Sequence, residues 1–65
     1  MRIDPKQVRV LLALQGKKQV DIMRTQSIPR GTLAHALNSD SISFATAEKI
    51  ANGLGVPVKD ILRKE

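Results

Sequence analysis

The stretch from Gln19 to Asn38 constrains this chain most, because it holds a proline between two short apolar patterns. A proline disfavours helix at the residue before it, here Ile28, and suits the first turn of a new helix. The sequence therefore predicts one helix over 19–25 and a second over 30–37, joined by a tight turn. Two short helices joined in this way form a helix-turn-helix, whose second helix can enter the DNA major groove.

The N-terminal segment has a strong helix start signal. The Asp4 carboxylate is an expected N-cap, Pro5 suits the first helical position, and Gln7 stands where a reciprocal capping-box partner belongs. Gly16 can adopt the positive φ that commonly follows the last turn of a helix. These signals predict a helix over 5–14.

Two further helices are predicted in the second half of the chain. Ser43 is the expected N-cap of a helix over 44–54, and Gly55 is its expected end. The apolar residues of this helix recur on one side, and we expect that buried stripe to start at Phe44. A last helix is predicted over 58–63 from three apolar residues, Val58, Ile61 and Leu62.

The predicted fold is a single all-α domain over residues 1–65, a compact five-helix bundle with a central helix-turn-helix. No segment alternates as a strand does. The chain has no Cys and one His, so neither disulfides nor a zinc site can staple it. No apolar run approaches the ~20 residues that span a bilayer, and we expect a cytoplasmic protein, in a bacterial nucleoid or a phage-infected cell, without a membrane partner.

The distribution of charge points to a polyanionic partner. The net charge is +5, and residues 1–38 hold seven basic and two acidic side chains, whereas residues 39–65 hold four of each. The surplus thus lies on the half that carries the predicted helix-turn-helix, which suits nucleic acid. On charge alone, a basic surface that only keeps the protein soluble is an equally good interpretation. One Phe and no Trp or Tyr argue against stacking on single strands and for a duplex.

Catalysis is not expected. The chain lacks a nucleophilic Cys, a cluster of His with Asp or Glu at ligand spacing, and a glycine-rich phosphate loop. We therefore expect no enzyme activity, no cofactor, no metal and no small-molecule ligand.

The outward face of the helix over 30–37 is the predicted reading surface. If Leu33, Ala36 and Leu37 point into the core, the remaining side chains point outward. An Arg there can bind guanine O6 and N7 with two hydrogen bonds, and small residues such as Gly31 and Ala34 allow close approach to base edges. The residues expected to contact bases are Arg30, Gly31, Ala34 and His35.

A second set of residues is expected to contact phosphates and to fix register without reading sequence. These residues are Lys17, Lys18, Gln19, Thr32, Asn38 and Ser39. Other interpretations stay open for several of them. Gln19 can cap its own helix or pair with the following turn, Asn38 can cap the end of its helix, the two lysines can form a solvated turn, and His35 can lack any contact.

The chain resembles the XRE family, the Cro and phage-repressor type of helix-turn-helix domain. The resemblance is carried by Gln19, by the run Ile-Pro-Arg-Gly-Thr-Leu over 28–33, by Thr-Ala-Glu-Lys-Ile-Ala-Asn-Gly-Leu-Gly-Val over 46–56, and by Asp-Ile-Leu over 60–62. It covers about residues 8–63. It implies a lambda-repressor-like five-helix domain that binds operator DNA as a dimer and regulates transcription.

Carried over by position, the resemblance implies that Gln19 contacts a phosphate and braces the third helix. It places base reading at Arg30, Gly31 and His35, and backbone contacts at Thr32 and Asn38. The chain departs from the family pattern around the turn, with Met23 for a small residue, Gln26 for a leucine, Ser27 for a glycine and Pro29 for a capping Ser or Thr.

The function expected from these observations is a sequence-specific, repressor-like regulator that binds double-stranded operator DNA as a homodimer. Two alternatives stay open: an antitoxin or anti-repressor that acts mainly through a protein partner, and a non-specific nucleoid-type DNA binder. The dimer contact is expected in the neutral C-terminal part, with Ile42 and Val56 as exposed apolar residues.

Overall fold

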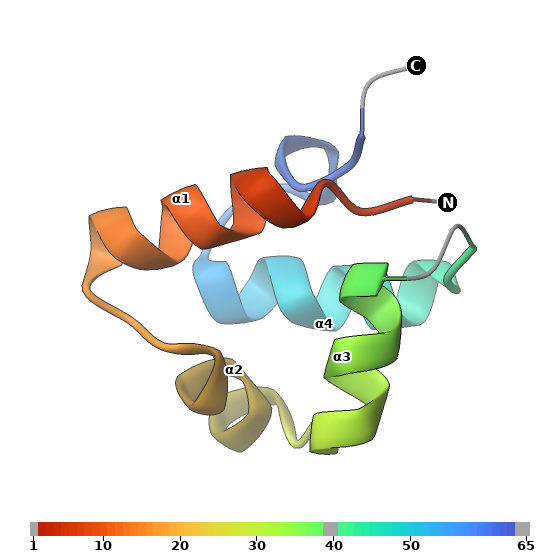
Figure 1. Cartoon of the computed structure of the whole chain (residues 1–65), viewed down its shortest axis with the longest axis horizontal. Helices are drawn as coiled ribbons and strands as arrows, with labels where there is room; N and C mark the ends of the chain where they lie inside the picture. Colours follow the sequence, from red (N-terminus) through yellow and green to blue (C-terminus); the bar gives the residue numbers. More distant parts are fainter. Residues whose placement is uncertain (1, 39–40, 64–65) are drawn as a thin grey trace.

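A computed structural model describes residues 2–38 and 41–63 of the chain. This part contains four α-helices, no strand, and one isolated antiparallel bridge between Ile3 and Leu62. In Figure 1, α4 runs between α1 on one side and α2 on the other, and α3 crosses in front of α4. The elements are α1 (Pro5–Gln15), α2 (Gln19–Gln26), α3 (Arg30–Asn38), α4 (Phe44–Leu54) and a 3₁₀ turn, η1 (Val58–Asp60).

The start and the end of α1 follow from local chemistry. Asp4 Oδ1 accepts hydrogen bonds from the backbone N–H groups of Lys6 and Gln7 at 3.0 and 3.4 Å, and Gly16 takes a φ of 65° after the last turn. The capping-box role predicted for Gln7 is wrong, because the Asp4 N–H donates to the Ile61 carbonyl at 2.8 Å instead. The start of α1 is thereby tied to the far end of the chain.

The bounds predicted for α4 are confirmed. Ser43 Oγ accepts from the Thr46 N–H at 3.2 Å, and Gly55 closes the helix with a φ of 68°. The expectation for Phe44 is wrong, since 55% of it is exposed. It opens the helix one turn before Ala47, the first buried residue of the stripe. The residues that α4 buries are Ala47, Ile50, Ala51 and Leu54.

The predicted helix over 58–63, and with it the five-helix count, is wrong. Only the single turn η1 forms there. The backbone groups that would extend it bond to the start of the chain, because the Ile61 carbonyl accepts from Asp4 at 2.8 Å and the Arg63 N–H donates to Arg2 at 2.9 Å. Pairing with the N-terminal segment therefore replaces the intrahelical ladder at this end.

One apolar core joins all four helices and the C-terminal turn. Ile42 and Val56, expected to be exposed, are instead half-buried and pack against this core, so the expected exposure is wrong, whereas the dimer contact in the C-terminal part stays a prediction. Ile42 lies in the connection before α4, and Val56 lies in the connection between α4 and η1. The buried members of the core are Ile3, Val8, Leu12, Ile22, Ile28, Leu33, Ala36, Ile50, Ala51, Leu54 and Ile61.

Candidate functional site

The connection between α2 and α3 is a tight turn held by one buried side chain. Ser27 adopts the left-handed conformation with a φ of 54°, which glycine usually occupies. Ile28 then donates its N–H to the Met23 carbonyl at 2.9 Å and buries its side chain in the core. Pro29 follows and cannot cap α3, because it has no side-chain acceptor. The buried Ile28 thus fixes where α3 begins relative to α2.

The two sides of α3 divide as the sequence predicts. Leu33 and Ala36 are buried and Leu37 is half-buried. All six residues that were predicted to contact DNA from this helix are exposed: Arg30, Gly31, Thr32, Ala34, His35 and Asn38. Their accessibility is confirmed, whereas their contacts with DNA stay predictions.

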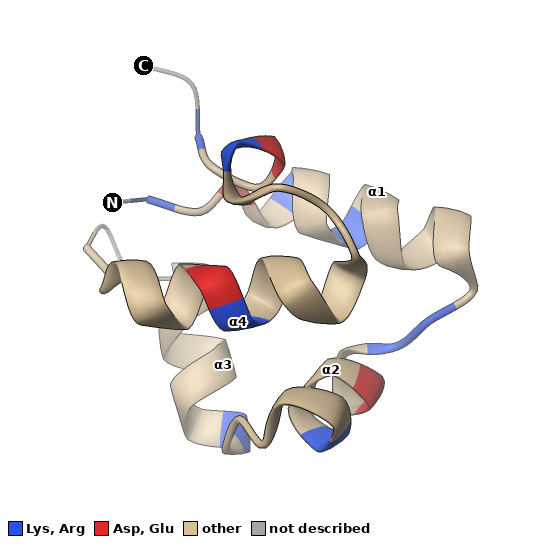
Figure 2. Cartoon of the chain, turned by 180° about the vertical axis from the view of Figure 1, so that it is seen from behind, with Lys and Arg blue, Asp and Glu red and all other residues tan. Residues whose placement is uncertain are grey.

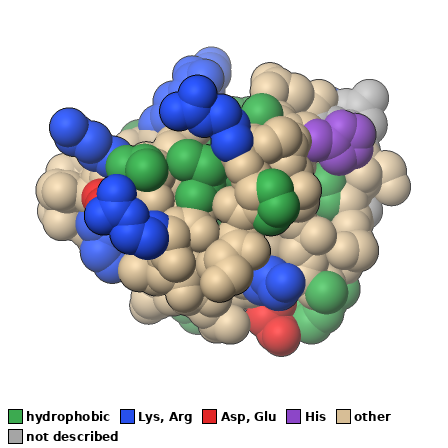
Figure 3. Space-filling view, turned by 90° about the horizontal axis from the view of Figure 1, so that it is seen from below, with side chains coloured by type: hydrophobic (Ala, Val, Ile, Leu, Met, Phe, Trp, Pro, Cys, Tyr) green, Lys and Arg blue, Asp and Glu red, His purple; other side chains and the backbone are tan. Residues whose placement is uncertain are grey.

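A shallow hollow of about 460 Å³ lies between the start of α2 and the start of α3. It brings together four of the predicted residues, two of them cationic, and none of the described residues that line it is acidic. Figure 3 views this side of the molecule, where Lys and Arg side chains surround a small group of hydrophobic ones. The lining residues are Lys18, Gln19, Val20, Met23, Arg30, Leu33 and Ala34. The chemistry of this surface suits an anionic ligand with apolar edges.

The polar side chains at this hollow are not used by the fold. Arg30 and Gln19 are exposed, and neither side chain makes a hydrogen bond or ion pair within the described part of the chain. Arg30 therefore presents a full guanidinium charge, with five donors, to whatever binds here. Val20, which sequence reasoning missed, adds an exposed apolar side chain at the rim.

The start of α2 is capped by a residue that the sequence interpretation overlooked. The Lys18 backbone N–H donates to Asp21 Oδ2 at 2.8 Å, so Asp21 and not Gln19 caps this helix. The spacing of three residues from N-cap to carboxylate was the available signal. The amide of Gln19, at the first helical position, is not used for this cap and has no hydrogen bond among the described residues.

Three of the predicted phosphate-contacting residues that the structure describes do not line this hollow: Lys17, Thr32 and Asn38. Lys17 Nζ donates to the Gly53 carbonyl at 3.3 Å, at the C-terminal end of α4, where the helix dipole favours a cation. Asn38 Nδ2 donates to the Ala34 carbonyl at 2.8 Å, so its amide helps to cap its own helix. Ser39 falls outside the described residues.

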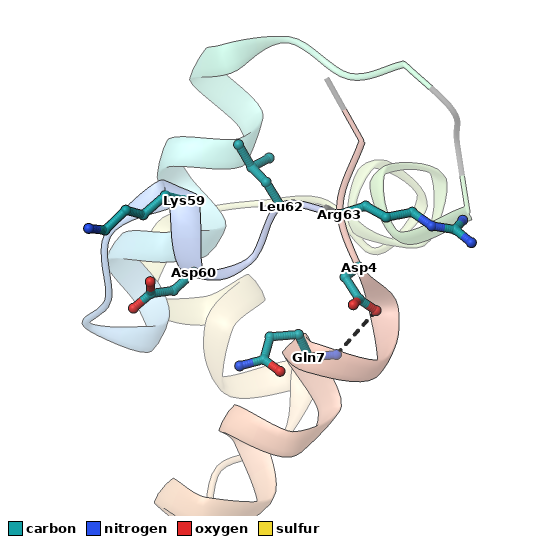
Figure 4. Close-up of a pocket in the computed structure, with 6 residues that line it drawn as sticks. All are labelled: Asp4, Gln7, Lys59, Asp60, Leu62 and Arg63. Carbon is teal, nitrogen blue, oxygen red and sulfur yellow. Dashed lines mark hydrogen bonds between the residues drawn. The ribbon is translucent and has the colours of Figure 1, made fainter. Parts of the chain in front are cut away.

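A second hollow, of about 400 Å³, lies where η1 meets the start of α1 (Figure 4). It has mixed charge, because two acidic residues, Asp4 and Asp60, line it together with two basic ones, Lys59 and Arg63. Gln7 and Leu62 complete the lining. This balance gives the hollow no preference for a polyanion, in contrast to the one between α2 and α3. Among the described residues no group of three His, Asp or Glu side chains gathers as a metal site would require.

The chain matches no protein-family model, no curated protein and no solved structure. None of the helices in the described part combines the length and the apolar character needed to cross a membrane.

Proposed function

We propose that this chain is a sequence-specific, double-stranded-DNA-binding regulator of the helix-turn-helix, lambda-repressor-like type. In this proposal α2 and α3 form the helix-turn-helix unit, and α3 enters the major groove with its exposed face toward the base edges. The observation that carries the proposal is Arg30, which is exposed beside Lys18 and Gln19 and has no ion pair among the described residues.

Base reading is assigned to the exposed face of α3. Arg30 would bind a guanine through O6 and N7, and Ala34 would contact a thymine methyl group. Gly31 has no side chain and so would allow the helix backbone to approach the base edges closely. A Cβ built on it would meet nothing within 4 Å, so the fold itself does not require a glycine there. His35 lies on the same exposed face and can donate to or accept from a base or a phosphate.

Backbone contacts are assigned to the start of α2. Lys18 and Gln19 would hold one phosphate strand at the edge of the groove, and the exposed Thr32 on α3 is assigned the same role. A homodimer would then read two half-sites about one helical turn, roughly 34–36 Å, apart. Repression is the proposed outcome, because a protein bound at an operator excludes other proteins from that site.

The test is selection of bound duplexes from a random pool, followed by affinity measurements on the selected site. Arg30→Ala should cost ~1–3 kcal/mol of binding free energy and relax the preference at one base pair. Lys18→Ala should weaken selected and unrelated duplexes alike, and should lower the salt slope by about 1.

Lys49→Ala is the matched control. Lys49 is an exposed cation of α4, and it does not line the hollow between α2 and α3. Unchanged binding by Arg30→Ala would refute the assignment of that residue. Equal affinity of the unaltered protein for all duplexes would favour the non-specific nucleoid-type binder.

A second candidate function, an antitoxin-like or anti-repressor protein, is favoured by one observation on α1. Val10 and Leu14 are 49% and 78% exposed, one turn apart, opposite the buried Val8 and Leu12. A helix with apolar residues on both sides suits burial against a partner. Co-purification of a stable heterocomplex that Leu14→Ser disrupts, with duplex binding unchanged, would favour this function.

A further inference from the structure

A cluster of three cations lies at the C-terminal end of α3, at the other end from Lys18 and Gln19. Lys6 and Arg9 reach it from α1, and Arg63 reaches it from the segment after η1. With Asp4, Pro5 and Asn38 they line a hollow of about 420 Å³. Figure 2 shows basic residues on α1, on the connection to α2 and at the start of α3. We call Lys6, Arg9 and Arg63 the α1–tail cluster.

The fold holds these cations together without neutralising them. All three side chains are exposed, and none makes an ion pair or hydrogen bond with another described residue. Among the described residues that line this hollow, Asp4 is the only acidic one, and its carboxylate accepts from the backbone N–H groups of Lys6 and Gln7. Three cations against this one carboxylate leave an excess of positive charge among the described lining residues.

The backbone fixes where Arg63 emerges. Its N–H donates to the Arg2 carbonyl at 2.9 Å, and the neighbouring Leu62 forms the antiparallel bridge to Ile3. In Figure 4 the Arg63 side chain points away from Lys59 and Asp60. This pairing brings a residue from the end of the chain beside the first turn of α1, and so completes the α1–tail cluster.

The position of the cluster relative to α3 suggests its ligand. Asn38 lies in the last turn of α3 on the same side as Ala34 and Gly31, because residues three and four apart share a helical face. The nine residues of α3 span about 12 Å, which is close to the width of the major groove. A helix seated in that groove has a phosphate strand along each wall, and a cationic group lies at each end of α3.

We propose that the α1–tail cluster binds phosphates of the duplex backbone at the opposite end of α3 from Lys18 and Gln19. This inference rests on the proposed function, and it adds three residues that sequence reasoning did not select. The cluster clamps the duplex and fixes the depth of α3, and it carries no sequence information.

The test measures binding of a labelled random-sequence duplex at several salt concentrations. Lys6→Gln/Arg9→Gln should lower the slope of log affinity against log salt by about 2, because each lost phosphate contact removes about 0.9. Arg63→Gln, which alters no helix, should lower it by about 1. Lys49→Gln removes one positive charge, as Arg63→Gln does, but from α4, which lies in front of α3 in Figure 2. This variant should leave the slope unchanged.

Lys18→Gln separates this inference from the proposed function. If Lys18→Gln lowers the slope while both cluster variants keep the wild-type slope, the cluster is wrongly assigned and the proposed function stands. If the unaltered protein has no measurable duplex affinity, the proposed function and this inference both fail.

A free phosphorylated molecule is the other source of the same chemistry, and inorganic pyrophosphate is the probe for it. Its effect on backbone amide resonances is measured for the unaltered protein and for Lys6→Gln/Arg9→Gln. Two results together would overturn the assignment to the DNA backbone. Pyrophosphate would shift the amide resonances of residues 6 and 9 in the unaltered protein and not in the variant, and the variant would keep the wild-type slope of log duplex affinity against log salt.

Discussion

The helices α3 and α4 are similar in length and differ in almost everything that stabilises a helix. α4 has a side-chain N-cap at Ser43, a left-handed glycine at its end, and four buried residues. α3 follows a proline that cannot cap it, and it buries only Leu33 and Ala36 completely. The comparison indicates a division of labour, in which α4 supplies stability and α3 supplies accessible surface.

The two glycines inside these helices show the same contrast. A Cβ on Gly53 of α4 would lie 3.0 Å from Ile22 Cγ2, so this glycine allows α2 to approach α4 closely. A Cβ on Gly31 of α3 would meet nothing within 4 Å. One glycine is therefore required by packing within the molecule, and the other is free to serve contact with a ligand.

The largest expected effect is in the core face of α4. Ile50→Ala removes a side chain that is 0% exposed, and such truncations cost about 2–5 kcal/mol. A domain of this size has a total stability of only a few kcal/mol, so we expect most molecules to be unfolded at 25 °C. Circular dichroism during urea titration measures this, with Lys49→Ala as the exposed control on the same helix. A wild-type unfolding midpoint for Ile50→Ala would contradict the role given to α4.

A smaller loss is expected from Gly53→Ala. The new methyl group would press on Ile22, which is 1% exposed and has little room to move. Overpacking costs about 1–3 kcal/mol and outweighs the gain of about 1 kcal/mol in helix propensity. We expect a net loss of about 1 kcal/mol in the free energy of unfolding, measured from the urea midpoint. A rise in that midpoint would show that α2 and α4 adjust freely.

The smallest effect on stability, with the opposite sign, is expected from Gly31→Ala. With open space around the new methyl group, the fold should gain about 0.5–1 kcal/mol from helix propensity. Duplex affinity should fall, because in the proposed complex the methyl group would lie between α3 and the base edges. Urea titration and duplex titration of this one variant measure both. A gain in stability without loss of affinity would place Gly31 outside the DNA contact.

Helix boundaries were the part of the fold most accessible to sequence reasoning. Asp4, Ser43, Gly16 and Gly55 act on backbone groups only a few residues away, so their effects can be read from spacing. The outward face of α3 could be predicted for a related reason. Three apolar residues define its buried side, and the remaining residues form the exposed side. Phe44 shows the limit of the method, because periodicity assigns a face without showing whether a neighbour covers it.

The candidate site was only partly accessible to sequence reasoning. Lys18 and Gln19 precede or open a helix, and their approach to Arg30 follows once the turn is tight. Lys17 appeared equivalent to Lys18, yet its ammonium group bonds to Gly53 in α4, which adjacent positions in sequence do not reveal. No local pattern links Arg9 to Arg63.

By itself, the sequence determined the all-helical character, where four helices begin, where they end to within one residue, and which side of α3 is left exposed, because capping and helical periodicity act over a few residues. Only the tertiary structure decided that residues 58–63 form a single 3₁₀ turn instead of a helix. It also decided that Lys6, Arg9 and Arg63 lie at one hollow. The reason is physical: the Ile61 carbonyl and the Arg63 N–H find partners at Asp4 and Arg2. Such hydrogen bonds join segments nearly a whole chain apart, and no local rule specifies them.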